Sequence, residues 1–259
     1  MSGEYPTDWL TCRYPYDAEA RDPDLEKLVI DLLRSGDSPV IVDLGAGNGS
    51  NYRYFSEKLP QNTTWICVER DPLLASELIK LGNNLEVICD DVMDLPKYLD
   101  NRDVTLVMAN ALFDLFPWDK LHGLLTHIHS REIPCYGTLN YTNMKFSPAH
   151  PSDTKVADLY HRHMQRPRPA GAATGPQAPY MIQQRFGVKC LAAPSTWNLS
   201  SDDPTIQSYL LGFMENAIPE LPLTTKEQQM FEEWIELRRL QLQGSELGMV
   251  VSHVDLFIR

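Results

Sequence analysis

The chain has 259 residues, of which 43% are apolar and 22% charged, and its 35 acidic and 23 basic side chains give a net charge of −12. This composition is that of a folded globule and excludes disorder for most of the chain. The negative charge makes nucleic acid and anionic membrane surfaces poor partners, and no apolar run is long enough to span a bilayer. The first residues show no signal-peptide pattern and the five cysteines are scattered, so we expect a reduced, cytoplasmic protein.

The predicted elements alternate between strand and helix. The first is a helix from Asp22 to Ser35, because leucine and valine recur at helical spacing behind an Asp-Pro start. Short apolar runs then alternate with amphipathic segments, which is typical of a parallel sheet with helices on both faces. The predicted strands are Val40–Leu44, Trp65–Val68, Leu85–Cys89, Val104–Ala109, Ile133–Leu139, Val188–Ala192 and Met249–Ile258, and the further helices are 51–59, 71–81, 117–128, 178–186 and most of 204–244.

The length of the chain and its pattern of predicted elements fit one domain over residues 1–259. Its first segment is either a lid over the site or a frayed, solvated arm. A polar stretch rich in proline and glycine follows the fifth strand, and a connection of this length is typical of an active-site loop. The predicted parts are the arm 1–21, a core 22–140, a loop insertion 141–179 and a C-terminal part 180–259 with a helical insert 204–244, in which Thr224 and Glu227 form a capping box.

The strongest motif is the glycine loop after the first strand. Glycines at 45, 47 and 49 let the backbone approach a ligand closely. A dinucleotide-binding loop would carry glycine where this chain has Ser50, and Asp43 would repel a pyrophosphate there. Asp43 instead suits a cationic head such as an ammonium group.

Two more acidic residues follow the next two strands. Glu69 ends the second strand, where a carboxylate can accept both hydroxyls of a ribose. Asp91 follows the third strand, where it can meet the amino group of a base. With Asp43 these residues face one crevice and favour a ligand with an amino acid, a ribose and an adenine, and no phosphate.

These motifs resemble those of a known family. The stretches VDLGAGNGS, VERDP and CDDVMDLP are similar to the first three motifs of class I S-adenosylmethionine-dependent methyltransferases, over about residues 20–140. The resemblance implies a Rossmann-like, mostly parallel seven-stranded α/β sheet in the order 3-2-1-4-5-7-6, with the last strand antiparallel. It implies S-adenosylmethionine as cofactor and S-adenosylhomocysteine as product. The segments Trp9–Arg21 and His150–Pro176 also resemble a bacterial subgroup of small-molecule type, which indicates no particular substrate.

Cofactor contacts are carried over by position. Asp43, Gly45 and Gly47 would hold the methionine part, with Asn110 beside it. Glu69 would hold the ribose, and Asp91 and Val92 would flank the adenine. The full implied set is Asp43, Gly45, Ala46, Gly47, Asn48, Glu69, Arg70, Asp91, Val92, Asn110 and Ala111.

The chain departs from the nucleic-acid and glutamine methyltransferases after strand four. It reads Asn-Ala-Leu-Phe-Asp over 110–114, without the Asn/Asp-Pro-Pro-Tyr motif and without a Pro-Cys nucleophile. The loop is more similar to those of small-molecule methyltransferases. We therefore expect N- or O-methylation of a small-molecule acceptor by in-line displacement, in which the protein aligns the nucleophile, the methyl carbon and the sulfur.

Catalytic candidates are Asp114 and Tyr141. Asp114 either starts a helix or faces the acceptor as base or orienter. His161 and His163 form an H-x-H pattern, but residues two apart do not face one another on a helix, which disfavours a metal site. The short basic cluster 162–168 is a solvated face or an anion site. Substrate-binding candidates are Arg13, Tyr16, Asn140, Tyr160 and His163, with loop-start hydrogen bonding as the alternative for Asn140 and for Tyr141.

Three other functions stay open. The same fold can transfer an aminopropyl group from decarboxylated S-adenosylmethionine, or it can bind the cofactor and a partner protein without catalysis. A nicotinamide-dependent oxidoreductase is disfavoured by Ser50 and Asp43. The sequence does not decide between a monomer and a homodimer.

Overall fold

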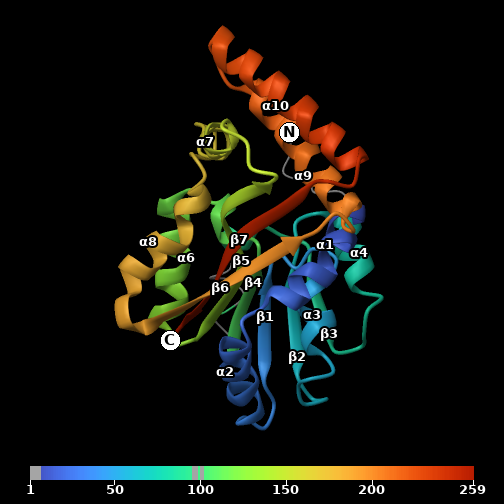
Figure 1. The fold of residues 1–259 in the computed structure, drawn as a ribbon. Helices are drawn as coiled ribbons and strands as arrows, with labels where there is room; N and C mark the ends of the chain where they lie inside the picture. Colours follow the sequence, from blue (N-terminus) through green and yellow to red (C-terminus); the bar gives the residue numbers. More distant parts are fainter. Residues whose placement is uncertain (1–6, 95–98, 100–101) are drawn as a thin grey trace.

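The computed structural model describes residues 7–94, 99 and 102–259 and centres on a seven-stranded sheet (Figure 1). The strand order is β3-β2-β1-β4-β5-β7-β6. Strand β7 runs antiparallel to β5 and β6, while β1 to β5 pair in parallel. The predicted order and strand directions are thereby confirmed. The strands are β1 (Val40–Leu44), β2 (Thr64–Val68), β3 (Leu85–Ile88), β4 (Leu106–Asn110), β5 (Cys135–Ser147), β6 (Cys190–Leu199) and β7 (Gly248–Ile258).

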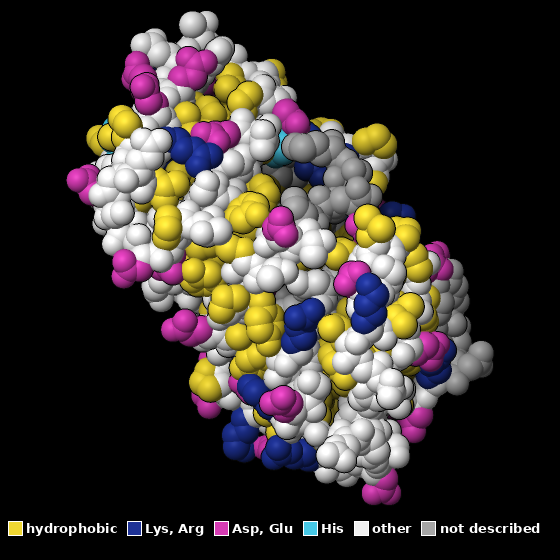
Figure 2. All heavy atoms as spheres, turned by 90° about the vertical axis from the view of Figure 1, so that its right-hand side faces the viewer, with side chains coloured by type: hydrophobic (Ala, Val, Ile, Leu, Met, Phe, Trp, Pro, Cys, Tyr) yellow, Lys and Arg dark blue, Asp and Glu magenta, His cyan; other side chains and the backbone are white. Residues whose placement is uncertain are grey.

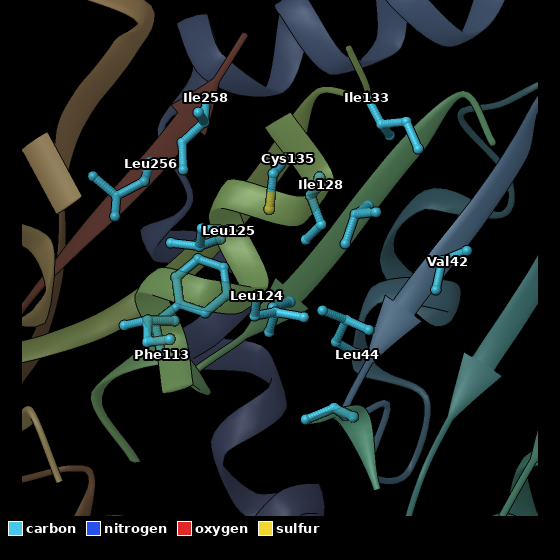
Figure 3. Packing of buried hydrophobic residues seen from close by; sticks show 14 of the residues in the cluster. Val42, Leu44, Phe113, Leu124, Leu125, Ile128, Ile133, Cys135, Leu256 and Ile258 are labelled. Atoms are coloured by element: carbon cyan, nitrogen blue, oxygen red, sulfur yellow. The ribbon is translucent and has the colours of Figure 1, made fainter. Parts of the chain in front are cut away.

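Two helical layers cover the central strands. On one face, side chains of β1, β2 and β4 pack with α2 (Pro23–Arg34), α3 (Ser50–Phe55) and α4 (Pro72–Leu78). On the other face they pack with α6 (Trp118–Ser130) and α8 (Ala178–Phe186). Figure 3 shows Leu124, Leu125 and Ile128 of α6 gathered with Val42 and Leu44 of β1. The alternate side chains of each strand thus serve opposite layers, which explains the continuous apolar runs.

A third cluster of apolar side chains lies where β5, β6 and β7 extend beyond the other strands. It joins these strands to α1 (Thr7–Ala20), α7 (Asp153–Met164), α9 (Pro204–Ala217) and α10 (Thr225–Gln243). Trp9, Trp197 and Trp234 are buried in it. Figure 1 shows α7, α9 and α10 grouped at this end of the molecule.

The predicted loop over 141–179 is wrong for more than half of its length. Strand β5 continues to Ser147, helix α7 follows, and a 3-10 turn (Gly175–Gln177) leads into α8, so more than half of the insertion is regular. Tertiary contacts hold α7 in place: Val156 is buried, and Asp153 accepts hydrogen bonds from Trp234 Nε1 and from Arg238 of α10. The strand predicted at 188–192 begins at Cys190 instead and runs to Leu199.

Local start signals work as predicted. The Asp22 carboxylate accepts from the backbone N–H groups of Asp24 and Leu25 and caps α2. Asp71 caps α4 in the same manner. Thr224 and Glu227 form the predicted capping box at the start of α10.

The surface is mixed in charge. Figure 2 shows acidic side chains spread over one face of the molecule, with lysine and arginine side chains lying between them. Within the described ranges, no helix combines the length and apolarity needed to cross a membrane. Each of the five cysteines, all in described segments, is a free thiol.

Candidate cofactor and acceptor site

The glycine loop turns sharply from β1 into α3. Gly45, Gly47 and Gly49 have φ values of +60°, +57° and +85°, a region that side chains disfavour. Space is limited as well, because a side chain at position 45 would collide with Leu112. The loop is tied down by the bond from Ala46 N to Val68 O (3.1 Å), so its backbone is held close to the end of β2.

Asp43 lies buried beneath this loop. One carboxylate oxygen accepts a 2.7 Å hydrogen bond from Asn51 Nδ2, and Asn51 in turn accepts from Arg21. The other oxygen, Oδ2, is buried without a partner. Burial raises the pKa of Asp43 to about 7, although Asn51 and Arg21 oppose that shift. An ammonium group beside Oδ2 would supply the missing partner.

Glu69 joins β2 to the glycine loop. Its Oε2 accepts from Gly47 N at 2.8 Å and its Oε1 from Asp71 N at 2.9 Å. Both bonds fix the carboxylate at the carboxyl end of the strand, where each oxygen has a second lone pair. The side chain is buried, so only a ligand entering the crevice would reach it.

The end of β3 presents a looser arrangement. Asp91 is exposed, and its Oδ1 accepts from Met93 N as the cap of a short 3-10 turn over Val92–Asp94. Val92 is buried under this turn. Arg70 is exposed on the neighbouring connection. The end of the third motif, at residues 95 and 96, lies outside the described residues.

Asn110 ends β4 and links three elements. Its amide donates to Asp17 Oδ2 (3.1 Å) and to Ser50 Oγ (3.4 Å), and its carbonyl accepts from Thr138 Oγ1 (2.8 Å). Asp17 belongs to α1, so the N-terminal helix reaches the carboxyl ends of the central strands. Ala111 follows with a φ of +51°, which turns the chain away from the sheet.

Helix α1 covers the glycine loop. Leu10 Cδ1 lies 3.5 Å from the position that a Cβ would take if residue 47 were not glycine. Asn48 Nδ2 lies 3.5 Å from Thr11 Oγ1. Trp9 and Asp17 are buried. The alternative of a frayed arm is therefore wrong for residues 7–20, while residues 1–6 lie outside the described part of the chain.

Asp114 lies in a short 3-10 turn (Phe113–Leu115) beyond β4. The residue is only 5% exposed, and its Oδ1 has no hydrogen-bond partner. Burial raises the pKa of Asp114 to about 7, against the opposing charge of Arg13. The insertion returns to this turn, because Thr174 donates from both N and Oγ1 to Phe116 O.

Tyr141 and His161 form a pair beside this turn. The Tyr141 hydroxyl and His161 Nε2 are hydrogen-bonded at 2.9 Å. Burial raises the pKa of Tyr141, and the neighbouring Tyr160 and Asp114 add to the shift. Burial lowers the pKa of His161, so both groups are neutral near pH 7.

The remaining substrate candidates divide into two sets. The first set is Arg13 and Tyr160. Arg13 forms a bidentate pair with Asp17 (2.9 and 3.0 Å), and its guanidinium lies over the Trp197 ring. The ring centroids of Tyr160 and Tyr141 are 6.3 Å apart. The second set is Tyr16, Asn140 and His163, whose polar atoms are hydrogen-bonded to other parts of the chain. Tyr16 donates to Asp203, and Asn140 donates to the backbone carbonyls of Gly137 and Val254. His163 is hydrogen-bonded to Glu220 at 3.0 Å.

The placement of His163 corrects the predicted site. His163 turns toward Glu220, and His161, two residues earlier on α7, is the histidine that reaches Tyr141. Asp17 belongs to the arm predicted as a lid or a frayed segment, but it was not among the predicted substrate-binding residues. The signal for Asp17 was its i, i+4 spacing from Arg13 in the arm. No set of three potential metal ligands clusters among the described residues.

Two hollows lie among the helices α7, α9 and α10. The larger, about 730 Å³, lies between α9 and α10 beside Tyr209 and Phe213, and holds none of the predicted site residues. The other, about 650 Å³, is lined by His161 and Arg162 of α7 and by Arg166, which follows that helix.

Solved structures with a similar fold extend over nearly the whole chain. A cyclopropane-fatty-acyl-phospholipid synthase-like protein from Lactobacillus casei is 13% identical, with a TM-score of 0.57 over 95% of this chain and 99% of the other. A methyltransferase candidate from Bacillus halodurans is 9% identical, with a TM-score of 0.52 over 92% and 99%. The YcgJ protein of Bacillus subtilis is 13% identical, with a TM-score of 0.52 over 90% and 97%. No protein-family model and no curated protein sequence matches this chain.

At these identities the likeness shows the fold. The seven-stranded sheet, its strand order and its helical layers are those of the class I methyltransferase fold. The fold that the resemblance of the motifs implies is therefore the fold that the structure has.

Proposed function

We propose that this protein is an S-adenosylmethionine-dependent methyltransferase that acts on a small molecule. The observation that carries the proposal is the buried, half-bonded carboxylate of Asp43 under a glycine loop whose Gly47 N–H is bonded to Glu69. A site built from carboxylates favours an ammonium group and hydroxyls, and it disfavours phosphates.

The residues at the strand ends fit this cofactor. Asp43 Oδ2 would accept from its ammonium group, and the Glu69 carboxylate would accept from its ribose hydroxyls. Buried Val92 would lie against its adenine. The proposed set is Asp43, Gly45, Ala46, Gly47, Asn48, Glu69, Arg70, Asp91, Val92, Asn110 and Ala111.

The bound cofactor would supply a methyl group already activated by a sulfonium centre. The chain's own residues then have three tasks: to align the acceptor, to exclude water and to receive a proton. Helix α1 lies over the glycine loop, Asp114 lies beyond β4, and Tyr141 lies in the part of β5 that extends beyond its pairing with β4. We assign Asp114 and Tyr141 to the acceptor, with Arg13 and Tyr160 beside them.

The acceptor is an amine or a hydroxyl compound in this proposal. An unpartnered carboxylate oxygen on Asp114 suits a donor N–H or O–H group. Cytoplasmic location is part of the same proposal and rests on the sequence.

Ligand-dependent thermal stability tests the cofactor. The full chain is heated with S-adenosylhomocysteine, S-adenosylmethionine, decarboxylated S-adenosylmethionine and NAD in separate samples. A ligand at about 100 times its Kd stabilises by about 2.7 kcal/mol, which is roughly 5–11 °C for a domain of this size. We expect the shift with the first two ligands, its loss in Asp43→Asn and its retention in Asp37→Asn, a change in an exposed turn.

Turnover then separates the functions. With a methyl-labelled cofactor and a panel of amines and phenols, label in one class of acceptor supports a methyltransferase. A shift with the decarboxylated ligand alone indicates aminopropyl transfer. Binding without turnover on any of these acceptors indicates a cofactor-binding module, and a shift with NAD alone would overturn the proposal.

A further inference from the structure

The pair formed by Tyr141 and His161 lies between two regions of the molecule. Tyr141 follows the carboxyl end of the parallel part of β5 and is close enough to Asp114 for that charge to raise its pKa. His161 is half-buried on α7 and lines the 650 Å³ hollow. The 2.9 Å bond between Tyr141 Oη and His161 Nε2 thus connects the strand-end site with the hollow.

Both groups are in the protonation state that a relay needs. The raised pKa of Tyr141 keeps its hydroxyl protonated, so it can donate to the imidazole. The lowered pKa of His161 keeps its ring neutral, so Nε2 can accept. The neighbouring His253 is different, since burial lowers its pKa to about 3 and its Nδ1 is bonded to Ser195 O. His163 is bonded to Glu220.

We propose that His161 is a positioning residue that draws the acceptor's proton through the Tyr141 hydroxyl and passes it to the hollow. This rests on the proposed function. An acceptor N–H or O–H that takes up a methyl group has one proton to lose. That proton moves to Tyr141 Oη, the proton already on Oη moves to His161 Nε2, and the positive charge ends on the imidazolium.

The surroundings of His161 can hold and release that charge. On α7 the charged groups are Asp158, whose carboxylate favours the imidazolium, and Arg162, which is paired with Glu227. Arg166 follows the helix and is paired with Glu220. The facing segments contribute Pro176, Gln177 and Leu221, which do not titrate. On the other side of the bond, the Tyr141 ring packs against Tyr160 and His253. The charge of Asp114 contributes to the raised pKa of Tyr141.

The first test determines the protonation state of His161 in the absence of an acceptor. The full chain labelled with ¹⁵N-histidine is titrated by NMR from pH 5 to 8, with and without S-adenosylhomocysteine. We expect His161 Nε2 to be unprotonated and hydrogen-bonded at pH 7, to titrate below the ordinary histidine value, and to change its resonance in Tyr141→Phe while His163 stays the same. A proton on Nε2 at pH 7, or an unmoved resonance in Tyr141→Phe, would overturn the proposal.

The second test uses rate, with the amines and phenols of the acceptor panel as probes. His161→Gln keeps a hydrogen-bonding group but cannot take a proton, so we expect its kcat to fall roughly 100-fold and the acidic limb of the pH profile to disappear. His163→Gln, on the same helix, keeps both. An unchanged pH profile in His161→Gln overturns the relay. Binding of S-adenosylhomocysteine is measured in the wild type and in each variant. Unchanged binding in all variants shows that a failure concerns the relay alone. Absent binding in the wild type would instead mean that the proposed function is wrong.

Discussion

The Asp17 carboxylate of α1 accepts a hydrogen bond of 3.1 Å from the Asn110 amide at the end of β4, and the same carboxylate is paired with Arg13. This contact fastens the N-terminal helix to the point in the sheet where the strand order reverses. Ligands of open α/β sheets bind at that point. In the proposed function, helix α1 is therefore part of the site and contributes to its roof.

Substitution of Asp17 should destabilise the whole protein. Asp17→Asn removes one charge of a pair whose side chains are 13% and 1% exposed, and leaves the Arg13 guanidinium uncompensated. Breaking a buried pair costs about 3 kcal/mol, so we expect Tm to fall by roughly 6–12 °C. Thermal unfolding measures this. The matched control is Asp31→Asn, which breaks the exposed i, i+4 pair with Lys27 and should leave Tm unchanged. Equal effects of the two variants would contradict a structural role for Asp17.

Glu69 should control cofactor affinity. Glu69→Gln presents an amide where the carboxylate accepts from Gly47 N and Asp71 N, so one backbone N–H loses its acceptor. Hydrogen bonds to a charged group contribute about 1.5–3 kcal/mol, so we expect the Kd for S-adenosylhomocysteine to rise roughly 10- to 100-fold. Calorimetric titration measures the Kd. Glu86→Gln, which affects only the exposed pair with Arg102 on β3, serves as control, and a Kd that rises equally in both variants would remove Glu69 from the site.

Asp114 should make stability depend on pH. Its folded pKa of about 7 lies above its ordinary value of 3.8, so the folded state binds a proton that the unfolded state has lost between these values. The contribution of Asp114 to stability is therefore complete below pH 4 and is lost as the pH rises through 7. In Asp114→Asn we expect a flatter dependence of the free energy of unfolding between pH 4 and 8.

Urea unfolding at several pH values measures this dependence. The exposed Asp119 at the start of α6 provides the control, since Asp119→Asn should follow the wild-type profile. If Asp114→Asn also follows it, the carboxyl group of Asp114 is ionised in the folded protein.

The alternation of strands and helices was predictable because it depends on local patterns. The run Val40–Leu44 predicts β1 to the residue, since both faces of that strand are covered by helices. Helix α7 was assigned to a loop because proline and glycine are frequent in the stretch around it, although Val156 and Leu159 form a buried face. Its position depends on Asp153 being bonded to Trp234 and Arg238, far along the chain.

The site was predictable where it follows the backbone and unpredictable where it depends on packing. Asp43, Glu69 and Asn110 lie at or next to the carboxyl ends of strands, and the parallel sheet brings these ends together. The choice between His161 and His163 depends on the rotation of α7 about its own axis, which only its contacts with β5 and Glu220 fix. Asp17 depends likewise on where α1 docks.

The glycine loop should tolerate side chains poorly. Gly49 has a φ of +85°, and a Cβ there would lie 2.4 Å from Leu81 Cδ1, so Gly49→Ala meets both backbone strain and a collision. The strain alone costs roughly 1–2 kcal/mol, and moving Leu81 adds to it, so we expect Tm to fall by at least about 2 °C. Gly36→Ala is the control, because nothing lies within 4 Å of its Cβ position. That variant should keep or slightly raise Tm by reducing the freedom of the unfolded chain. A Gly49→Ala protein as stable as Gly36→Ala would show that the loop adopts another backbone conformation in solution.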